Sequence, residues 1–333
     1  MPGLELASVV TSNEERGEEA RSRHPGVAVL PSADALFAAA DAHDLVVVAA
    51  PNREHVPLGL RAVDAGLHLV VDKPIAASVA DAQRLASAAA ERCVVAAVFH
   101  NRRWDGDFLT LRGLLEEGAL GEPLRLESRF ERWRPEVDAH RWREGAAPED
   151  AGGVLFDLGP HLIDQALVLF GPVLSVYAEV RALRPAAQVD DDFFVALEHE
   201  SGARSQLWGT MLAAEPGARL RALGTRAAYV KRGLDVQEEQ LRGGASPRDP
   251  GFGEELESAW GRLGAGEHSE PVPTQPGRYV DFYERMERAV RAAGDGAGGS
   301  AAEPPVPLAA GVETLRVIEA ARRSSAERAV VTL

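Results

Sequence analysis

Short apolar runs alternate with amphipathic stretches over the first hundred residues of the chain. Their near-continuous apolarity is typical of parallel strands that are covered on both faces. The runs that predict strands are LELASVV, VAVL, LVVVAA, LHLVV and VVAAVF, at residues 4–10, 27–30, 45–50, 67–71 and 94–99. The stretches between them predict helices at residues 14–22, 32–40, 54–65 and 79–90. This alternation predicts a Rossmann-type, doubly wound parallel sheet in an α/β domain at residues 1–103.

The pattern changes after Trp104 to strands that are separated mainly by turns, which predicts an α+β domain with a large, mainly antiparallel open sheet at residues 104–333. The predicted strands lie at residues 124–132, 173–183, 192–200, 203–211, 219–223 and 227–230, and the predicted helices at 108–117, 279–293 and 312–324. Residues 242–277, rich in Gly, Pro and Glu, predict a surface excursion, and residues 292–305 predict a flexible loop.

Charge and cysteine content exclude several classes of partner. The chain has 36 Lys and Arg against 51 Asp and Glu, a net charge of −15, which would repel nucleic acids and anionic membranes. Its longest apolar run, at residues 45–51, is too short to span a bilayer. The single cysteine, Cys93, cannot form an internal disulfide, as expected in a reducing cytoplasm. We therefore expect a cytoplasmic protein with neither a nucleic-acid nor a membrane partner.

Polar loops follow three of the predicted parallel strands, at the sheet edge where such folds bind ligands. They read PNREH, DKP and HNRRWD. Lys73, in DKP, could hydrogen-bond a substrate hydroxyl and stabilise the alkoxide that precedes hydride loss. The alternative is a surface lysine paired with Asp72.

A second group of polar residues lies in GGVLFDLGPHLIDQALVLFG. On a helix, Asp157 and His161 share one face, and Asp164 follows one turn later. An acid beside a histidine raises its pKa and sets its tautomer, as a general base acting on an alcohol requires. The alternatives are a buried structural histidine and a metal site, for which no third ligand is evident. We expect no metal.

Basic and aromatic residues also cluster in NRRWDGDF and ERWRPEVDAHRWRE. Arginine and tryptophan side by side could line a polyol pocket, with the first donating hydrogen bonds and the second stacking on a ring. A solvated loop or packing at a domain interface would explain the same residues.

These motifs resemble the glucose-fructose oxidoreductase / inositol dehydrogenase / MocA (Gfo/Idh/MocA) family over essentially the whole chain. VVVAAPNREH, HLVVDKP, VFHNRRWDGDF and the glycine-led helix segment occur in the family's order and spacing. The details are most similar to its NADP-dependent scyllo-inositol dehydrogenase branch. The resemblance implies an oxidoreductase acting on a secondary hydroxyl of a cyclic polyol or sugar, and a second domain whose open sheet is often used for homo-oligomerisation.

The resemblance also implies roles for single residues. Lys73 matches the family's catalytic lysine, His161 its proton-transferring histidine, and Asp157 the acid that binds substrate and supports the histidine. Asp72 stands where the family more often has glutamate. The other expected contacts are to the cofactor, from Ala50, Pro51, Asn52, His55, Asp72 and Lys73, and to the substrate, from Asn101, Arg103, Trp133 and His140.

The segment TSNEER after the first predicted strand bears on the choice of cofactor. NAD binders place an acid at the end of the second Rossmann strand, whereas NADP binders offer hydroxyls and an arginine. Here Thr11, Ser12 and Asn13 precede any acid, and Arg16 lies one turn into the helix. We expect NADP, with NAD as the alternative because two glutamates follow Asn13.

The chain departs from the family at its start. Family members carry a strand, a Gly-x-Gly-x-x-Gly turn and a helix before the segment that matches PGLELASVV. From the sequence as printed we expect weaker dinucleotide binding and an unpaired strand edge beside residues 4–10, unless the true start lies upstream. The alternative functions are therefore a truncated, non-catalytic relative that keeps the fold and the polyol pocket, and a metal-dependent hydrolase using Asp157 and His161.

Overall fold

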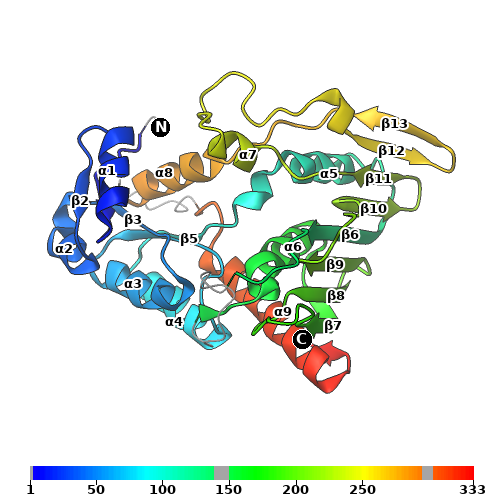
Figure 1. Ribbon diagram of the computed structural model, residues 1–333, viewed down its shortest axis with the longest axis horizontal. Coiled ribbons are helices and arrows are strands. Elements are labelled where there is room, and N and C mark those ends of the chain that lie inside the picture. Colours follow the sequence, from blue (N-terminus) through cyan, green and yellow to red (C-terminus); the bar gives the residue numbers. More distant parts are fainter. Residues whose placement is uncertain (1–2, 139–149, 295–302) are drawn as a thin grey trace.

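The computed structural model describes residues 3–138, 150–294 and 303–333. The first five strands and their crossover helices lie on one side of Figure 1, and a large sheet lies on the other. This arrangement confirms a Rossmann-type unit followed by a unit built on a mainly antiparallel sheet.

The N-terminal unit alternates strands and helices as the sequence predicts. All its strand pairs are parallel. Ser32 and Ser78 cap their helices, because each hydroxyl accepts the N–H of the residue three positions later. The elements are β1 (Ser8–Val10), α1 (Glu14–Arg23), β2 (Ala28–Leu30), α2 (Ala33–Ala38), β3 (Leu45–Val48), α3 (Asn52–Asp64), β4 (His68–Val71), α4 (Val79–Glu91) and β5 (Ala96–Val98), with the 3₁₀ turns η1 (Ala40–Ala42) and η2 (Asn101–Trp104).

The parallel strands form two separate pieces. In the described chain β1 pairs only with β2, while β3, β4 and β5 form the other piece in that order. Ser8 at the start of β1 reaches His43, just before β3, with Oγ 2.8 Å from Nε2. Val10 in β1 and Val47 in β3 are 40% and 46% exposed. The described β1 thus has one strand neighbour, as expected, and side chains connect the two pieces.

The second unit is organised around a nine-stranded sheet of order β13-β12-β11-β10-β6-β9-β8-β7-β14. Its pairs are antiparallel except for β6 and β9, which run parallel. The strands are β6 (Pro123–Glu131), β7 (Val173–Arg181), β8 (Asp192–His199), β9 (Arg204–Thr210), β10 (Leu220–Gly224), β11 (Ala228–Lys231), β12 (Gly261–Ala265), β13 (His268–Val272) and β14 (Val331–Thr332). The helical segments are α5 (Gly106–Glu116), α6 (Val154–Phe170), α7 (Gln237–Arg242), η5 (Glu257–Ala259), α8 (Val280–Gly294) and α9 (Leu308–Glu327).

The predicted surface excursion at residues 242–277 is wrong in part. It contains the hairpin of β12 and β13, which extends the large sheet and projects from the molecule in Figure 1. The residues of β13 are mostly exposed, so the strand lacks the alternating apolar pattern by which the others were recognised. Residues 295–302 of the predicted flexible loop lie outside the described residues.

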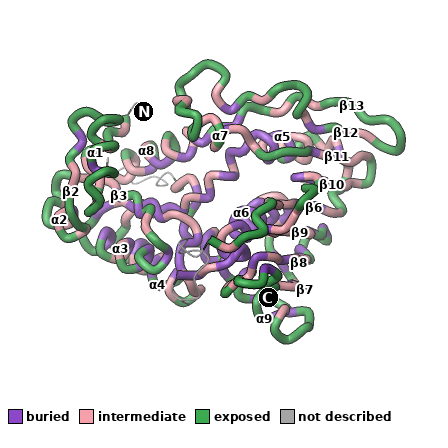
Figure 2. The backbone as a smooth tube through the Cα atoms, in the orientation of Figure 1, coloured by how far each residue is buried: buried purple, intermediate pink, exposed green. Residues whose placement is uncertain are grey.

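The helices α6 and α9 pack on the nine-stranded sheet, and Figure 2 shows buried residues along α6 and around α4. The helix α9 also contacts α4 and β5 of the N-terminal unit. Just before it, the backbone N–H of Val98 donates to the carbonyl of Val306 at 3.0 Å. The C-terminal segment therefore belongs to both cores, and it sets the carboxyl ends of β4 and β5 against α6.

Candidate active site

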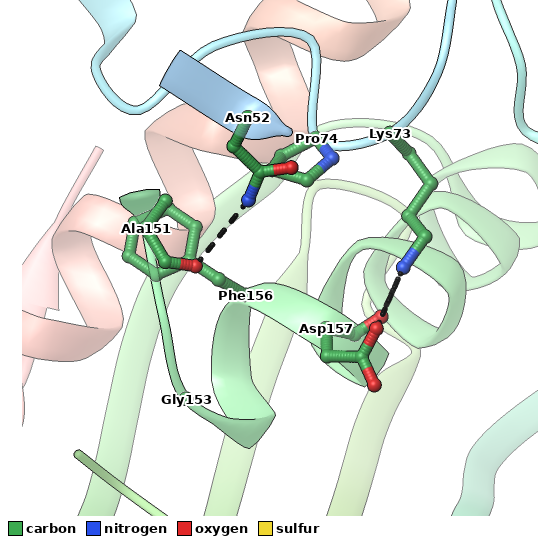
Figure 3. Close-up of a pocket in the computed structure, with 7 residues that line it drawn as sticks. All are labelled: Asn52, Lys73, Pro74, Ala151, Gly153, Phe156 and Asp157. Carbon is green, nitrogen blue, oxygen red and sulfur yellow. Dashed lines mark hydrogen bonds and ion pairs between the residues drawn. The ribbon is translucent and has the colours of Figure 1, made fainter. Parts of the chain in front are cut away.

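The carboxyl ends of β3 and β4 meet the start of α6 around a small pocket (Figure 3). The helix begins after Gly153, whose φ of +98° is accessible mainly to glycine. The carboxylate of Asp190 accepts the N–H of Leu155 at 2.7 Å and so caps the helix. The pocket is lined by Asn52, Lys73, Pro74, Ala151, Gly153, Phe156 and Asp157.

Lys73 is fixed by Asp157 across this pocket. Its ammonium donates to the Asp157 carboxylate at 3.0 Å and to the Asp157 carbonyl at 2.6 Å. Asp72 instead accepts the backbone N–H of Lys73, at 2.7 Å. The alternative of a surface lysine paired with Asp72 is therefore wrong, because the lysine is largely buried and its ion pair is with α6.

His161 lies one turn after Asp157 and is 7% exposed. Its Nδ1 is buried without a hydrogen-bond partner among the described residues, and its ring meets Phe130 edge-on, with the ring centroids 6.1 Å apart. Burial lowers the pKa of His161 well below its usual range, and the positive charge of Lys73 lowers it further. The expectation that Asp157 raises this pKa is wrong, because the carboxylate is paired with Lys73. The imidazole is therefore neutral at physiological pH.

Arg103 is held at the site by Asp164. The carboxylate accepts from Arg103 Nε at 2.8 Å and from Nη2 at 2.6 Å, in the two-point geometry typical of strong arginine pairs. Asn101 begins the same 3₁₀ turn, and no side-chain hydrogen bond to a described residue holds it. The turn after β5 therefore places these two predicted substrate residues beside α6.

Two predicted cofactor residues hold the pocket together. Asn52 donates to the carbonyl of Asp150 at 2.8 Å, which ties the start of α3 to the segment before α6. The ring nitrogens of His55 lie 2.7 Å from the carbonyl oxygen of Pro74 and 2.9 Å from that of Ala50. The buried ring of His55 thus joins two loops, and its contact with cofactor stays a prediction. Pro51 precedes α3, whose first turn has no side-chain cap.

The predicted phosphate selector follows β1. Thr11 Oγ1 accepts the Asn13 N–H at 3.2 Å, and Asn13 Oδ1 accepts the Arg16 N–H at 2.9 Å, so these two side chains shape the turn and cap α1. Ser12 and Arg16 are exposed, and neither side chain hydrogen-bonds a described residue. They are the residues of this segment that are free to bind a phosphate.

Two predicted substrate residues, Trp133 and His140, are not among the residues that line the described pocket. Trp133 is 58% exposed and its backbone forms a bridge with Leu212. His140 lies outside the described residues.

In the described ranges, no three His, Cys, Asp or Glu side chains gather in a way that could hold a metal ion. No helix described here is both long and apolar enough to cross a membrane.

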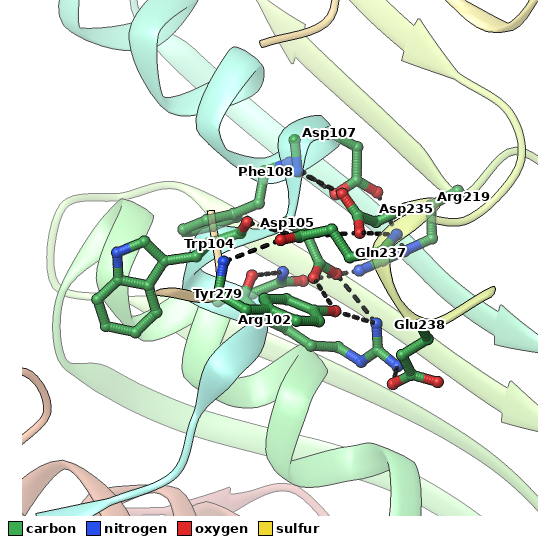
Figure 4. A network of polar contacts seen from close by, with 12 residues as sticks. Arg102, Trp104, Asp105, Asp107, Phe108, Arg219, Asp235, Gln237, Glu238 and Tyr279 are labelled. Atoms are coloured by element: carbon green, nitrogen blue, oxygen red, sulfur yellow. Dashed lines mark hydrogen bonds and ion pairs between the residues drawn. The ribbon is translucent and has the colours of Figure 1, made fainter. Parts of the chain in front are cut away.

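A buried polar network under the site was missed by the sequence analysis (Figure 4). Arg102 pairs with Asp105 at 3.2 Å and with Glu238, and burial raises the pKa of Asp105 while Arg102 opposes the rise. The guanidinium groups of Arg102 and Arg219 lie 4.9 and 4.2 Å from the ring centroid of Phe130, which contacts His161.

Gln165 connects this network to α6, because it donates to the carbonyl of Arg102 at 2.8 Å and accepts from Arg219 at 2.9 Å. His100, also missed, is 2% exposed, and burial lowers its pKa. The motif HNRRWD contained His100 and Arg102, but their partners come from distant segments and could not be paired by sequence spacing.

Comparison with known proteins decides the family. Residues 1–100 match the description "Oxidoreductase family, NAD-binding Rossmann fold", and residues 108–230 match "GFO/IDH/MocA C-terminal domain". The chain belongs to the Gfo/Idh/MocA family. It is therefore an NAD(P)-binding oxidoreductase, as the motifs at Lys73 and α6 indicated.

Curated relatives match the chain over nearly its full length. The uncharacterized oxidoreductase YdgJ of Escherichia coli is 40% identical over 100% of this chain and 92% of YdgJ. The scyllo-inositol 2-dehydrogenase (NADP(+)) IolW of Bacillus subtilis is 33% identical over 99% of this chain and 88% of IolW. The Gfo/Idh/MocA assignment thus covers both units of the fold.

Solved structures agree. The yvaA protein of Bacillus subtilis superposes with a TM-score of 0.90 at 31% identity, over 100% of this chain and 93% of that one. The YPO2259 protein of Yersinia pestis superposes with a TM-score of 0.89 at 35% identity, over 100% of this chain and 90% of that one. The two-unit arrangement in Figure 1 is therefore shared with other Gfo/Idh/MocA-like structures.

The donor groups on the Rossmann side fit a dinucleotide. The first turn of α3 offers backbone N–H groups without a side-chain cap, which suits an anionic or carbonyl oxygen. Ser12 and Arg16 offer a hydroxyl and a guanidinium after β1. These donors follow strands at one edge of the sheet, where dinucleotides bind in such folds.

Proposed function

We propose that this protein is an NADP-dependent oxidoreductase that interconverts a secondary alcohol and a ketone on a cyclic polyol or sugar, such as scyllo-inositol. The observation that carries the proposal is the ion pair of the Lys73 ammonium with Asp157, with the neutral imidazole of His161 one helical turn further along α6. A cation and an uncharged base beside one carboxylate are what alcohol oxidation requires.

The residues divide the reaction between them. In the oxidation direction His161 takes the hydroxyl proton, while Lys73 stabilises the negative charge that develops on the oxygen. The carboxylate of Asp157 orients the ammonium and accepts a hydrogen bond from a neighbouring substrate hydroxyl. A bound nicotinamide would supply the hydride acceptor for the carbinol carbon, so that one alcohol and one NADP⁺ would give one ketone, one NADPH and one proton.

The preference for NADP rests on the segment after β1. Ser12 and Arg16 are exposed and their side chains hydrogen-bond no residue in the described ranges, which suits a 2′-phosphate, whereas an acid in their place would favour the free ribose hydroxyls. The relative IolW carries NADP(+) in its name.

Asn101 and Arg103 would contact the substrate or the nicotinamide, and Trp133 and His140 would border the polyol pocket.

The proposal includes a homo-oligomer in the cytoplasm, formed through the open face of the sheet in residues 104–333. Tyr177, Phe194 and Trp208 form a row of ring contacts across β7, β8 and β9, with centroid distances of 6.4 and 5.1 Å. Tyr177 remains exposed. Aromatic side chains are enriched in the cores of protein interfaces.

Two measurements test the function. Fluorescence of added NADPH reports dinucleotide binding, and turnover of a panel of inositols and aldoses with NADP⁺ and NAD⁺ reports substrate and cofactor. We expect binding, and turnover that is faster with NADP⁺. Absence of dinucleotide binding would favour the non-catalytic, polyol-binding alternative. Activity that a chelator removes and that needs no dinucleotide would favour the metal-dependent alternative.

A further inference from the structure

Arg132 continues the inner face of β6 toward the active site. Leu126, Ser128 and Phe130 are buried on the face of the strand that packs against α6, and alternate residues of a strand share a face. Arg132 keeps the pairing beyond the end of β6: its N–H donates to Thr210 at 2.9 Å, and its carbonyl accepts from Ala213 at 3.0 Å. Its side chain therefore follows that of Phe130 on the same face.

The helix α6 sets Asp157 against this position. Phe130 contacts His161, and Asp157 lies one turn before His161, while Arg132 lies one strand repeat after Phe130. Going back one turn along α6 and forward one repeat along β6 therefore reaches the same end of the site, where Asp157 and Arg132 lie. Burial lowers the pKa of the Arg132 guanidinium, and the negative charge of Asp157 partly opposes this by raising it.

Arg132 differs from Lys73, Arg102 and Arg103 in forming no ion pair with a described residue. Lys73 is paired with Asp157, Arg102 with Asp105, and Arg103 with Asp164. The half-buried side chain of Arg132 makes neither a hydrogen bond nor an ion pair with any residue that the structure describes. A partly desolvated charge without a partner is costly, so a ligand that pairs with it gains a strong contact.

We propose that Arg132 binds an anionic group of the substrate, so that the protein prefers polyols or sugars carrying a carboxylate or a phosphate over neutral ones. Guanidinium groups bind both anions through two parallel hydrogen bonds. The reacting hydroxyl would lie at Lys73 and His161, and the anionic group would lie at Arg132, one helical turn from His161 at the level of Asp157. This inference rests on the proposed dehydrogenase function for its chemistry, but the anion contact can be measured without turnover.

The experiment compares matched substrates in three proteins. Glucose, glucuronate and glucose 6-phosphate are offered to the wild type, to Arg132→Gln and to Arg134→Gln, which alters the exposed arginine two residues on. We expect the wild type to prefer an anionic sugar. Arg132→Gln should lower kcat/KM for that sugar roughly 10- to 100-fold and leave glucose within about threefold, as expected for loss of a charged hydrogen bond. Arg134→Gln should resemble the wild type.

The anion that shows the Arg132-dependent loss, carboxylate or phosphate, identifies the group. Arg132→Lys keeps the charge and should recover part of the preference, which separates charge recognition from misfolding. Equal use of glucose and both anionic sugars by the wild type would overturn the inference. So would an equal loss for all three sugars in Arg132→Gln, or the same loss in Arg134→Gln.

Calorimetric titration of the same sugars separates this inference from the proposed function. Arg132-dependent binding of an anionic sugar, without NADP reduction, would support the anion site and contradict the dehydrogenase. Turnover of neutral polyols that is unchanged in Arg132→Gln, with no preference for anionic ones, would support the dehydrogenase and contradict the anion site.

Discussion

Lys73 donates two hydrogen bonds to one residue, Asp157, at 3.0 Å to its carboxylate and at 2.6 Å to its main-chain carbonyl. The lysine follows β4 of the Rossmann unit, and the aspartate lies in the first turn of α6. An ammonium has three N–H donors, and the third meets no acceptor in the described chain. One N–H of the Lys73 ammonium therefore remains to donate to a substrate oxygen, and the two bonds to Asp157 fix its position.

Replacing Lys73 with Ala should lower kcat roughly 10²- to 10³-fold, because the developing alkoxide loses its nearest positive charge. Binding of NADPH, followed by its fluorescence, should stay within about threefold of the wild type. Undiminished turnover would contradict the role of Lys73. Lys73→Arg keeps the charge but not the position, so little recovery is expected from it.

The acid limb of alcohol oxidation should lie below pH 6.5. Oxidation needs neutral His161, and its pKa is lowered, so the imidazole becomes protonated only at pH values below its ordinary pKa. Removing the Lys73 charge takes away one cause of the lowering, so the pKa of His161 should rise in Lys73→Met. NMR titration of labelled histidine measures both values. A His161 pKa above 6.5 in the wild type would contradict the burial argument.

Asp164→Asn should destabilise the fold by about 3 kcal/mol and raise KM for substrate, because Arg103 loses its two-point partner and its fixed direction. Denaturant unfolding and steady-state kinetics measure the two effects. The matched control is Glu116→Gln, which removes a 3.0 Å pair with Arg112 on the exposed face of α5 and should cost less than about 0.5 kcal/mol. Equal effects of the two changes would show that Asp164 has no special role.

Arg16→Ala should raise KM for NADP⁺ roughly 10-fold and leave KM for NAD⁺ nearly unchanged, since only the former carries the 2′-phosphate. Arg23→Ala, at the other end of α1, removes a charge that is already paired with Glu19 at 2.7 Å and serves as the control. A parallel rise in both KM values in Arg16→Ala would mean that Arg16 does not select the cofactor.

Gly153→Ala should destabilise the protein by about 2–4 kcal/mol and reduce activity. The new Cβ would lie 2.2 Å from the Asp190 carboxylate, which caps α6, and the φ of +98° is strained for alanine. Gly26→Ala isolates the strain: Gly26 has a similar φ of +96° with open space around it, so about 1–2 kcal/mol is expected there. Equal losses of stability in Gly153→Ala and Gly26→Ala would show that the clash with Asp190 adds nothing to the backbone strain.

The sequence located Lys73, Asn52 and Arg103 at the site because all three follow parallel strands, whose carboxyl ends lie at one edge by construction. It also placed Asp157 and His161 on one helix face, since that depends only on the helical period. These predictions needed no knowledge of tertiary contacts.

The chemical state of His161 could not be derived in this way. Its pKa depends on burial and on Lys73, Arg102 and Arg219, which come from different units of the chain. Spacing suggested Asp157 as its partner, but the lysine from β4 takes that carboxylate. The hairpin of β12 and β13 was missed for a related reason, because exposed strands that depend on a neighbouring strand carry little apolar signal.

The helix α9 bears on how substrate enters. Hinge closure requires two bodies to part and rotate about a few residues. Here one helix supplies side chains to both cores, and the main-chain bond from Val98 to Val306 joins the same two bodies. We therefore expect the catalytic groups to be assembled before substrate arrives, with access controlled by side chains at the rim and little domain rotation between turnovers.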